Sequence, residues 1–348
     1  MAIPKTMQAA IQRTPKGPLK IESVPVPEPG HGEILIKVVA CGVCHSDLHA
    51  VDGDWDPGPA MPLIPGHEVA GTIAKLGEGV ADLKIGDRVG VPWMFWSCGS
   101  CEFCTAGMET ICKKTEATGY SKPGGYAEYM VAPAAFCGRL SPKVDMYEIA
   151  PILCAGVTTY RGLKRTGARP GQWVTVLGVG GLGHIAVQYA RAMGMRVAAV
   201  DIADDKLKLA KTLGAELLVN AKDEEPGPAI HKAVGGTHAA LVTAVSPRAF
   251  EQSMTVLRPA GTVVFIGLPG GDKDAIRASI SGVVNTELTV RGSNVGTRTD
   301  LEEAVDFATR GLVTSMIEKQ PLAKINDIFE RMRAGKINGR VVLDLTAD

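Results

Sequence analysis

The chain has 348 residues, of which 45% are hydrophobic, so it can bury two ordinary cores rather than one. Lys and Arg together number 37, as do Asp and Glu, and this zero net charge without a basic run argues against nucleic acid as the main partner. The sequence contains no apolar run of about 18 residues, so no membrane span is predicted. The first residues lack the apolar centre of a signal peptide. We therefore expect a cytoplasmic protein without nucleic-acid or membrane partners.

The first 150 or so residues are rich in short strands. Runs of β-forming and apolar residues predict strands at 33–40, 67–77 and 124–133, separated by turns that contain Gly and Pro. Within 84–91 the sequence predicts a turn at Gly86-Asp87, followed by β-forming residues. Strands this short and irregular are typical of a partly open barrel.

From residue 155 the pattern changes to alternating helices and strands. Helices are expected at 157–167, 181–193, 204–213, 226–234 and 247–257. Strands are expected at 173–177, 196–200, 217–220, 239–245, 262–268 and 287–293. This alternation predicts an α/β fold with a doubly wound parallel sheet. Two further helices are expected at 300–310 and 324–334, and a strand at 339–345 that returns to the first domain.

Four cysteines lie close together in the sequence, with the spacing C-x2-C-x2-C-x7-C: Cys98, Cys101, Cys104 and Cys112. Four thiolates in so short a loop suit a closed tetrahedral zinc site. An iron–sulfur cluster is the competing interpretation, but the fourth cysteine does not follow as C-x3-C-P. Since four thiolates leave no open coordination position, we predict a structural zinc here.

A glycine-rich turn follows the strand expected at 173–177 and opens the next helix. It has the G-x-G-x-x-G pattern and consists of Gly178, Val179, Gly180, Gly181, Leu182 and Gly183. In this context the pattern predicts a pyrophosphate at the helix N-terminus. Asp201 ends the next strand and would bind the adenosine ribose hydroxyls, which favours NAD over NADP. Lys206 could also reach the ribose, or could be a solvated helix lysine.

The stretch from Cys44 to Glu68 holds the remaining chemistry, with a thiol, three imidazoles, a hydroxyl and two carboxylates near its ends. Cys44 and His67 are candidate zinc ligands, and Cys154 lies at the domain junction. Two cysteines and one histidine leave the fourth zinc position open, the arrangement known for alcohol dehydrogenase. Spacing alone selects neither Cys44 over Cys41 nor Cys154 over Cys137.

Together these motifs resemble the zinc-dependent medium-chain alcohol dehydrogenases, especially the tetrameric yeast and bacterial type. The resemblance extends over essentially the whole chain and rests on CGVCHSDLHAVDGDW (41–55), GHEVAG (66–71), the four-cysteine loop, LCAGVTTY (153–160), GVGGLG (178–183) with Asp201, and GRVV (339–342). It implies a GroES-like catalytic domain over residues 1–153 and 291–348, and a Rossmann NAD-binding domain over residues 154–290.

The resemblance also implies roles for single residues. Catalytic zinc would be bound by Cys44, His67 and Cys154. Asp47 would orient His67, and Glu68 would be a nearby carboxylate that can approach the metal. Ser46 and His49 would pass the alcohol proton to solvent. The cofactor would contact His45, Thr158 and Arg340, and the substrate pocket would be narrowed by Trp55 and Trp93.

The implied reaction is reversible hydride transfer from a small primary alcohol to NAD+, and the implied assembly is a homotetramer. Two other interpretations remain: a secondary-alcohol, polyol or NADP-linked aldehyde reductase of the same architecture, and a non-catalytic protein on this fold. Asp201 and the two pocket tryptophans argue against the first, and the complete ligand set argues against the second. The sequence assigns no role to Trp96 or to the segment 292–297.

Overall fold

We analysed a computed structural model of the chain, which describes residues 3–270 and 275–346. The chain forms two compact units. The first unit comprises Met1–Cys154, Gly296–Thr309 and Ser315–Asp348, and the second comprises Ala155–Val295 and Arg310–Thr314. The strand at Thr289–Gly292 pairs within the second unit's sheet, and this unit continues to residue 295.

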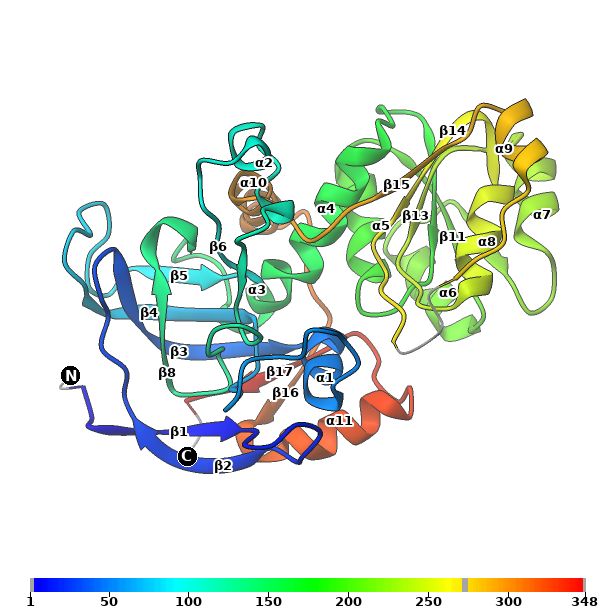
Figure 1. The fold of residues 1–348 in the computed structure, drawn as a ribbon. Coiled ribbons are helices and arrows are strands. Elements are labelled where there is room, and N and C mark those ends of the chain that lie inside the picture. The colour runs from blue at the N-terminus through cyan, green and yellow to red at the C-terminus, as the bar shows by residue number, and fades with distance from the viewer. Residues whose placement is uncertain (1–2, 271–274, 347–348) are drawn as a thin grey trace. The chain divides into compact units, whose positions relative to one another are not determined.

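The first unit is built on a mixed sheet (Figure 1), with the order β16-β17-β3-β4-β5-β9 and β8 paired to β3 among the residues described. Its strands are β1 (Thr6–Ile11), β2 (Lys20–Pro25), β3 (Glu33–Val43), β4 (Glu68–Leu76), β5 (Arg88–Val91), β6 (Met94–Trp96), β7 (Glu116–Ala117), β8 (Tyr129–Pro133), β9 (Gly138–Arg139), β16 (Ile317–Pro321) and β17 (Arg340–Asp344). As expected, β17 returns to this sheet, where it pairs antiparallel with β3.

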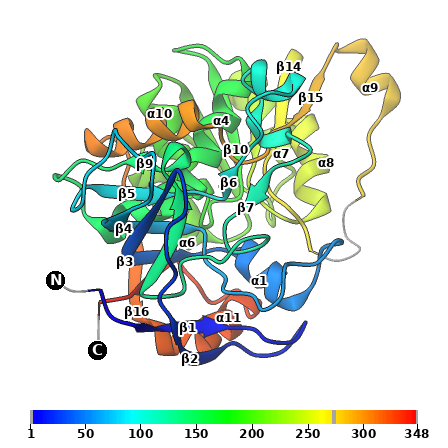
Figure 2. The same cartoon turned by 60° about the vertical axis from the view of Figure 1, so that its left-hand side comes forward.

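The helices of the first unit are short, apart from three. They are α1 (His45–Asp52), α2 (Glu102–Thr105), η1 (Glu109–Ile111), η2 (Ala134–Phe136), α3 (Met146–Ile149), η3 (Ala150–Leu153), α10 (Arg298–Thr309), η4 (Leu322–Lys324) and α11 (Ile325–Arg333). Figures 1 and 2 both show α11 beside β16 and the β1–β2 pair. It buries Ile325, Ile328, Phe329 and Met332 against the main core because these positions repeat along one helix face.

The second unit contains the expected parallel sheet, with the order β12-β11-β10-β13-β14-β15 among the residues described. Its elements are α4 (Ala155–Thr166), β10 (Trp173–Leu177), α5 (Gly183–Ala192), β11 (Arg196–Asp201), α6 (Asp204–Thr212), β12 (Leu217–Asn220), α7 (Pro226–Val234), β13 (Thr237–Val242), α8 (Pro247–Thr255), β14 (Leu257–Phe265), α9 (Ile280–Asn285) and β15 (Thr289–Gly292). Helices α5 and α4 contact each other, as do α7 and α8. Figure 2 shows α9 at the margin of this unit, close to β15.

The central strands of the second sheet are almost wholly apolar and buried, as strands covered on both faces must be. The carboxyl end of β10 leads directly into the glycine-rich turn, and the carboxyl end of β11 carries Asp201. The fold therefore places both parts of the expected nucleotide site at the same edge of the sheet. No helix in the described parts of the chain is long and apolar enough to cross a membrane.

Candidate functional site

Helix α1 begins directly after Cys44, and its first turn fixes the start of the candidate metal site. Cys44 is the N-cap residue, in extended conformation. The Asp47 side chain reaches back and accepts a hydrogen bond from the Cys44 backbone N–H at 2.9 Å. The capping interaction therefore ties the candidate ligand Cys44 to the carboxylate of Asp47.

Four buried side chains converge in the first unit. The ligand atoms of Cys44, His67, Glu68 and Cys154 all lie within 4.8 Å of one another, and His67 Nε2 is 3.2 Å from Cys154 Sγ. Atoms bound to one zinc lie about 3.5 to 3.8 Å apart, so the set has the dimensions of a metal site. Three elements supply it: the start of α1, the start of β4 and the end of η3.

The two cysteines that sequence spacing could not exclude lie elsewhere. The Cys41 thiol donates to Gly42 O, and the Cys137 thiol donates to Pro133 O. Burial raises the pKa of both thiols, and that of Cys137 reaches about 12. Neither belongs to a group of side chains that could hold a metal among the residues described.

The donor set calls for a cation. Contact between the two thiols lowers the pKa of Cys44 well below its usual value and raises that of Cys154 well above it. Glu68 Oε2 is buried and has no hydrogen-bond partner among the described residues. Two soft thiols and an imidazole suit zinc.

Glu68 is fully buried and its other oxygen forms an ion pair with Arg340. Burial raises the pKa of Glu68 to about 7, although the charge of Arg340 opposes the rise. Arg340 is 3% exposed and lies at the start of β17, so the guanidinium expected to contact a cofactor also holds Glu68.

Asp47 orients His67 in this structure. Its Oδ1 lies 2.8 Å from His67 Nδ1, and both side chains are fully buried. A carboxylate can only accept here, so His67 carries its proton on Nδ1 and leaves Nε2 free to bind a metal.

Ser46 and His49 lie one turn apart on α1, on the same side of the helix. Both are half-buried. His49 Nδ1 is 2.6 Å from Asp54 Oδ2, so a carboxylate beyond the end of the helix fixes the imidazole ring. This partner of His49 was not expected from the sequence. It lies just after Gly53, which ends α1 in the left-handed conformation and turns the chain back.

An aromatic wall adjoins the metal-ligand cluster. The Trp93 ring meets the His67 ring edge to face at 4.8 Å, and Trp55 packs on Trp93 at 6.2 Å. Tyr120, which the sequence did not single out, contacts both tryptophans and donates from its hydroxyl to Pro57 O at 2.5 Å. Trp96 pairs with Glu116 in the β6–β7 ladder and packs against the core of the first unit.

The four-cysteine loop forms a second, separate metal-ligand group. All four ligand atoms lie within 4.8 Å of one another, with Cys112 Sγ 3.6 Å and Cys104 Sγ 3.9 Å from Cys98 Sγ. Sulfurs bound to one tetrahedral zinc lie about 3.8 Å apart, so the loop fits a closed zinc site.

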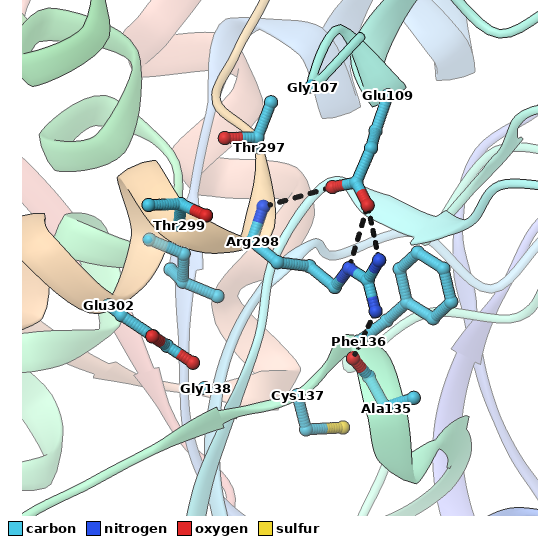
Figure 3. Close-up of a pocket in the computed structure, with 11 residues that line it drawn as sticks. Gly107, Glu109, Ala135, Phe136, Cys137, Gly138, Thr297, Arg298, Thr299 and Glu302 are labelled. Carbon is cyan, nitrogen blue, oxygen red and sulfur yellow. Dashed lines mark hydrogen bonds and ion pairs between the residues drawn. The ribbon is translucent and has the colours of Figure 1, made fainter. Parts of the chain in front are cut away.

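A pocket of ≈ 290 Å³ lies between this loop and α10 and is distinct from the buried cluster. Figure 3 shows Arg298 turned toward Glu109. The Arg298 guanidinium lies over the Phe136 ring, 4.7 Å from its centroid. None of the predicted site residues lines the pocket. The Glu109–Arg298 ion pair joins the four-cysteine loop to the N-terminus of α10, and both residues line this pocket. The pocket therefore lies where the loop is attached to the rest of the first unit.

In the second unit the glycine-rich turn has the expected form. Gly178 has φ of +92°, and a Cβ on Gly183 would come within 1.8 Å of Gly178 O, so a side chain at Gly183 would disrupt the turn. Around Gly180 a Cβ would meet nothing within 4 Å, which leaves room for a ligand. Asp201 accepts hydrogen bonds from Val179 N at 2.6 Å and Ile202 N at 2.7 Å.

The other predicted cofactor residues are distributed over both units. Thr158 is buried in α4, and Lys206 lies half-buried in the first turn of α6. His45 is exposed at the start of α1. Thr297 caps α10 through Asp300, so the segment 292–297 begins as β15 and ends as a helix cap.

Comparison with known proteins gives matches along the chain. Residues 30–142 match the model of the alcohol dehydrogenase GroES-like domain, and residues 181–310 match that of the zinc-binding dehydrogenases. The chain is 54% identical over 340 residues to an alcohol dehydrogenase of Moraxella sp. (strain TAE123) and 52% identical over 342 residues to one of Geobacillus stearothermophilus, in each case over 98% of this chain and 100% of the relative.

Solved structures agree with the sequence comparison. The alcohol dehydrogenase of Aeropyrum pernix aligns with a TM-score of 0.88 and 34% identity over 97% of this chain and 99% of its own. A cinnamyl alcohol dehydrogenase of Sorghum bicolor aligns with a TM-score of 0.89 and 30% identity over 99% of both chains.

Proposed function

Because this chain belongs to the zinc-dependent medium-chain alcohol dehydrogenase family, we propose that it oxidises a small primary alcohol reversibly to the aldehyde, with transfer of a hydride to NAD+ and release of a proton. The observation that carries the proposal is the buried cluster of two thiols, one imidazole and one carboxylate oxygen without a partner. Closed structural sites contain no such spare donor, whereas catalytic zinc sites keep a position open.

In this proposal Cys44, His67 and Cys154 hold the catalytic zinc, and Cys98, Cys101, Cys104 and Cys112 hold the structural one. Bound catalytic zinc supplies Lewis-acid chemistry, which makes the alcohol hydroxyl more acidic. Asp47 keeps His67 in the tautomer that binds a metal. Glu68, held by Arg340, keeps a carboxylate beside the ligands.

Proton removal falls to α1. Ser46 accepts a hydrogen bond from the alcohol, and His49 delivers the proton to solvent beside the exposed Asp54. The Asp54 contact supports this role because it fixes the imidazole ring. An imidazole suits proton transfer since its ordinary pKa, about 6.5, lies near neutral pH.

The dinucleotide binds the turn formed by Gly178, Gly180, Gly181, Leu182 and Gly183, with further contacts from His45, Thr158, Lys206 and Arg340. The room around Gly180 and the helix N-terminus beyond it support a pyrophosphate here. The Asp201 carboxylate at the end of β11 supports NAD, because a 2′-phosphate would meet its negative charge.

Trp55 and Trp93 form the wall of the alcohol pocket. Their contacts with each other and with His67 support a narrow pocket that favours short, unbranched substrates. Reduced thiols at both metal sites are consistent with a cytoplasmic location.

We also propose a homotetramer. Among the residues described, strand β15 is the edge of the second unit's sheet, and Val290 on it is 46% exposed. Nearby α9 exposes Ile280 and Val284. An unpaired edge strand with exposed apolar side chains is suited to pair with a second copy of the chain.

Steady-state kinetics over alcohols of increasing length and branching, with NAD+ and NADP+, test the proposed activity. We expect the highest kcat/KM for a short primary alcohol with NAD+. Cys44→Ser should abolish turnover while NAD still binds, and the matched change Cys41→Ser should leave turnover largely intact. A Cys44→Ser variant with full activity would refute the site.

A further inference from the structure

Asp47 is held by four donors, and one of them lies outside the expected site. Its Oδ1 accepts from His67 Nδ1 at 2.8 Å and from Gly66 N at 3.1 Å. Its Oδ2 accepts from Cys44 N and from the Tyr126 hydroxyl, each at 2.9 Å. Three of these donors belong to the ligand segments themselves, so only Tyr126 brings in an independent part of the fold.

The Tyr126 side chain is fixed by packing rather than by its hydroxyl. It is completely buried, and its ring contacts that of Phe329 on α11. Gly66 has φ of +98°, and a Cβ there would come within 2.4 Å of Tyr126 Cδ1, so the ring occupies the space of a missing side chain directly before His67.

The backbone around Tyr126 is tied to the same ligand loop. Tyr126 N donates to Pro65 O at 3.0 Å, and Gly125 N donates to Gly66 O at 2.8 Å. On its other side, Ala10 N donates to Tyr126 O at 2.8 Å, which connects the segment to β1. The hydroxyl therefore reaches Asp47 from a rigid base that does not depend on a metal.

We propose that Tyr126 is a positioning residue for the catalytic zinc site: its hydroxyl fixes the Asp47 carboxylate in the plane that orients His67. Without this donor, Asp47 Oδ2 keeps only the Cys44 N–H, and the buried carboxylate can rotate toward other donors. His67 Nε2 then loses its fixed direction toward the Cys154 thiol. The inference rests on the proposed function, since it concerns the zinc ligands named there.

Tyr126→Phe tests the hydroxyl alone, because the ring and its packing remain. Tyr129→Phe is the matched control, as Tyr129 is a buried tyrosine of the neighbouring strand β8 that belongs to a different core cluster. The measurement is the rate of zinc release from the purified full-length protein to a chromogenic chelator. The two release phases are assigned with Cys44→Ser and Cys101→Ser, each of which lacks one site.

In Tyr126→Phe we expect the catalytic zinc to be released about tenfold faster, with the structural zinc unchanged. The visible spectrum of the cobalt-substituted variant should also differ from that of the wild type, since it reports ligand geometry. Release rates unchanged in both phases, or raised equally in both, would overturn the proposal. A wild-type protein that releases only one zinc per chain would instead refute the proposed function, and the inference with it.

Discussion

Asp201 uses both carboxylate oxygens on the protein's own backbone, through Val179 N, Ile202 N and Ala203 N. It therefore shapes the glycine-rich turn as well as carrying the charge that favours NAD. An asparagine at this position keeps an acceptor oxygen for the backbone while it removes the charge.

Asp201→Asn should thus separate the two roles. We expect kcat/KM with NADP+ to rise relative to NAD+ by about tenfold, because one repulsive charge near the 2′-phosphate is lost. Steady-state kinetics with both cofactors measure the ratio. Asp205→Asn, an equal change of charge on the exposed face of α6, should leave it as in the wild type. An unaltered ratio in Asp201→Asn would contradict the role of its charge.

For single residues, the sequence predicted which side chains form the site better than it predicted the side chains that contact them. Cys44, His67 and Cys154 come together as the family resemblance implied. Cys41 lies within β3, whereas Cys44 follows the strand and caps α1. The spacing of the cysteines does not reveal where the strand ends, so it could not choose between them. Tyr126, Tyr120 and Asp54 were missed because their importance arises from contacts between distant segments.

Among the elements, the four-cysteine loop depends most on a bound group. The helices that it contains, α2 and η1, are each a single turn, too short to be stable alone. Its attachment to the rest of the first unit includes the Glu109–Arg298 ion pair. A metal that links its four thiolates would therefore contribute directly to the folding of this region.

Cys101→Ser should lower thermal stability before it affects the reaction. We expect one zinc per chain and a lower Tm, with kcat on a short alcohol changed by less than about threefold, since a structural site supports folding rather than chemistry. Metal analysis and differential scanning calorimetry measure the first two quantities. Cys137→Ser, outside both metal-ligand groups, is the control and should keep two zincs. Loss of turnover with no loss of stability would contradict a structural role.

The contact between α11 and β16 contains a bidentate pair, with Arg331 donating to both Glu318 oxygens at 2.7 and 2.6 Å. The hydrogen bond from Arg331 lowers the pKa of Glu318, against the effect of burial. A lowered pKa in the folded state means stabilisation above the unfolded pKa of about 4.3, lost as the pH falls through the folded value.

Arg331→Met should therefore reduce the free energy of unfolding at pH 7 by about 0.5 kcal/mol, a small value because both side chains are more than a third exposed. The difference from the wild type should shrink as the pH is lowered below 4. Urea unfolding at several pH values measures it, with Lys324→Met as a charge-matched control on the adjoining turn. A difference that stays constant down to pH 2 would contradict the linkage.

Most elements were predicted from the sequence within a few residues, and the exceptions have local causes. The strand expected at 124–133 begins only at Tyr129, because residues 124–126 bond to the ligand loop at 64–66 instead of joining a sheet. The turn expected at Gly86-Asp87 is present, with Asp87 N donating to Lys84 O, and the strand expected after it begins at Arg88. At residues 124–126 hydrogen bonds to a distant loop overrode an apolar pattern typical of strands.

Apolar side chains are exposed at the β15 edge of the second unit's sheet, where we propose that copies of the chain associate. Val290→Lys should place a charge on β15 and disfavour pairing with a second copy. We expect the sedimentation coefficient of the variant to fall from that of a tetramer to that of a smaller species. Ile85→Lys, an exposed position of the first unit, should leave it unchanged. Two variants that sediment alike would contradict the proposed role of this edge.

Because β17 belongs to the first unit, the two units are not completed in the order in which they begin during synthesis. Arg340, the partner of Glu68, lies in β17, and the whole second unit is translated between β3 and this strand. A nascent chain can finish the nucleotide-binding unit while Glu68 still lacks its counter-charge. The Glu68–Arg340 ion pair thus forms only once β17 has been made, so a chain that stops short of β17 would contain all four members of the buried cluster but not the guanidinium that pairs with Glu68.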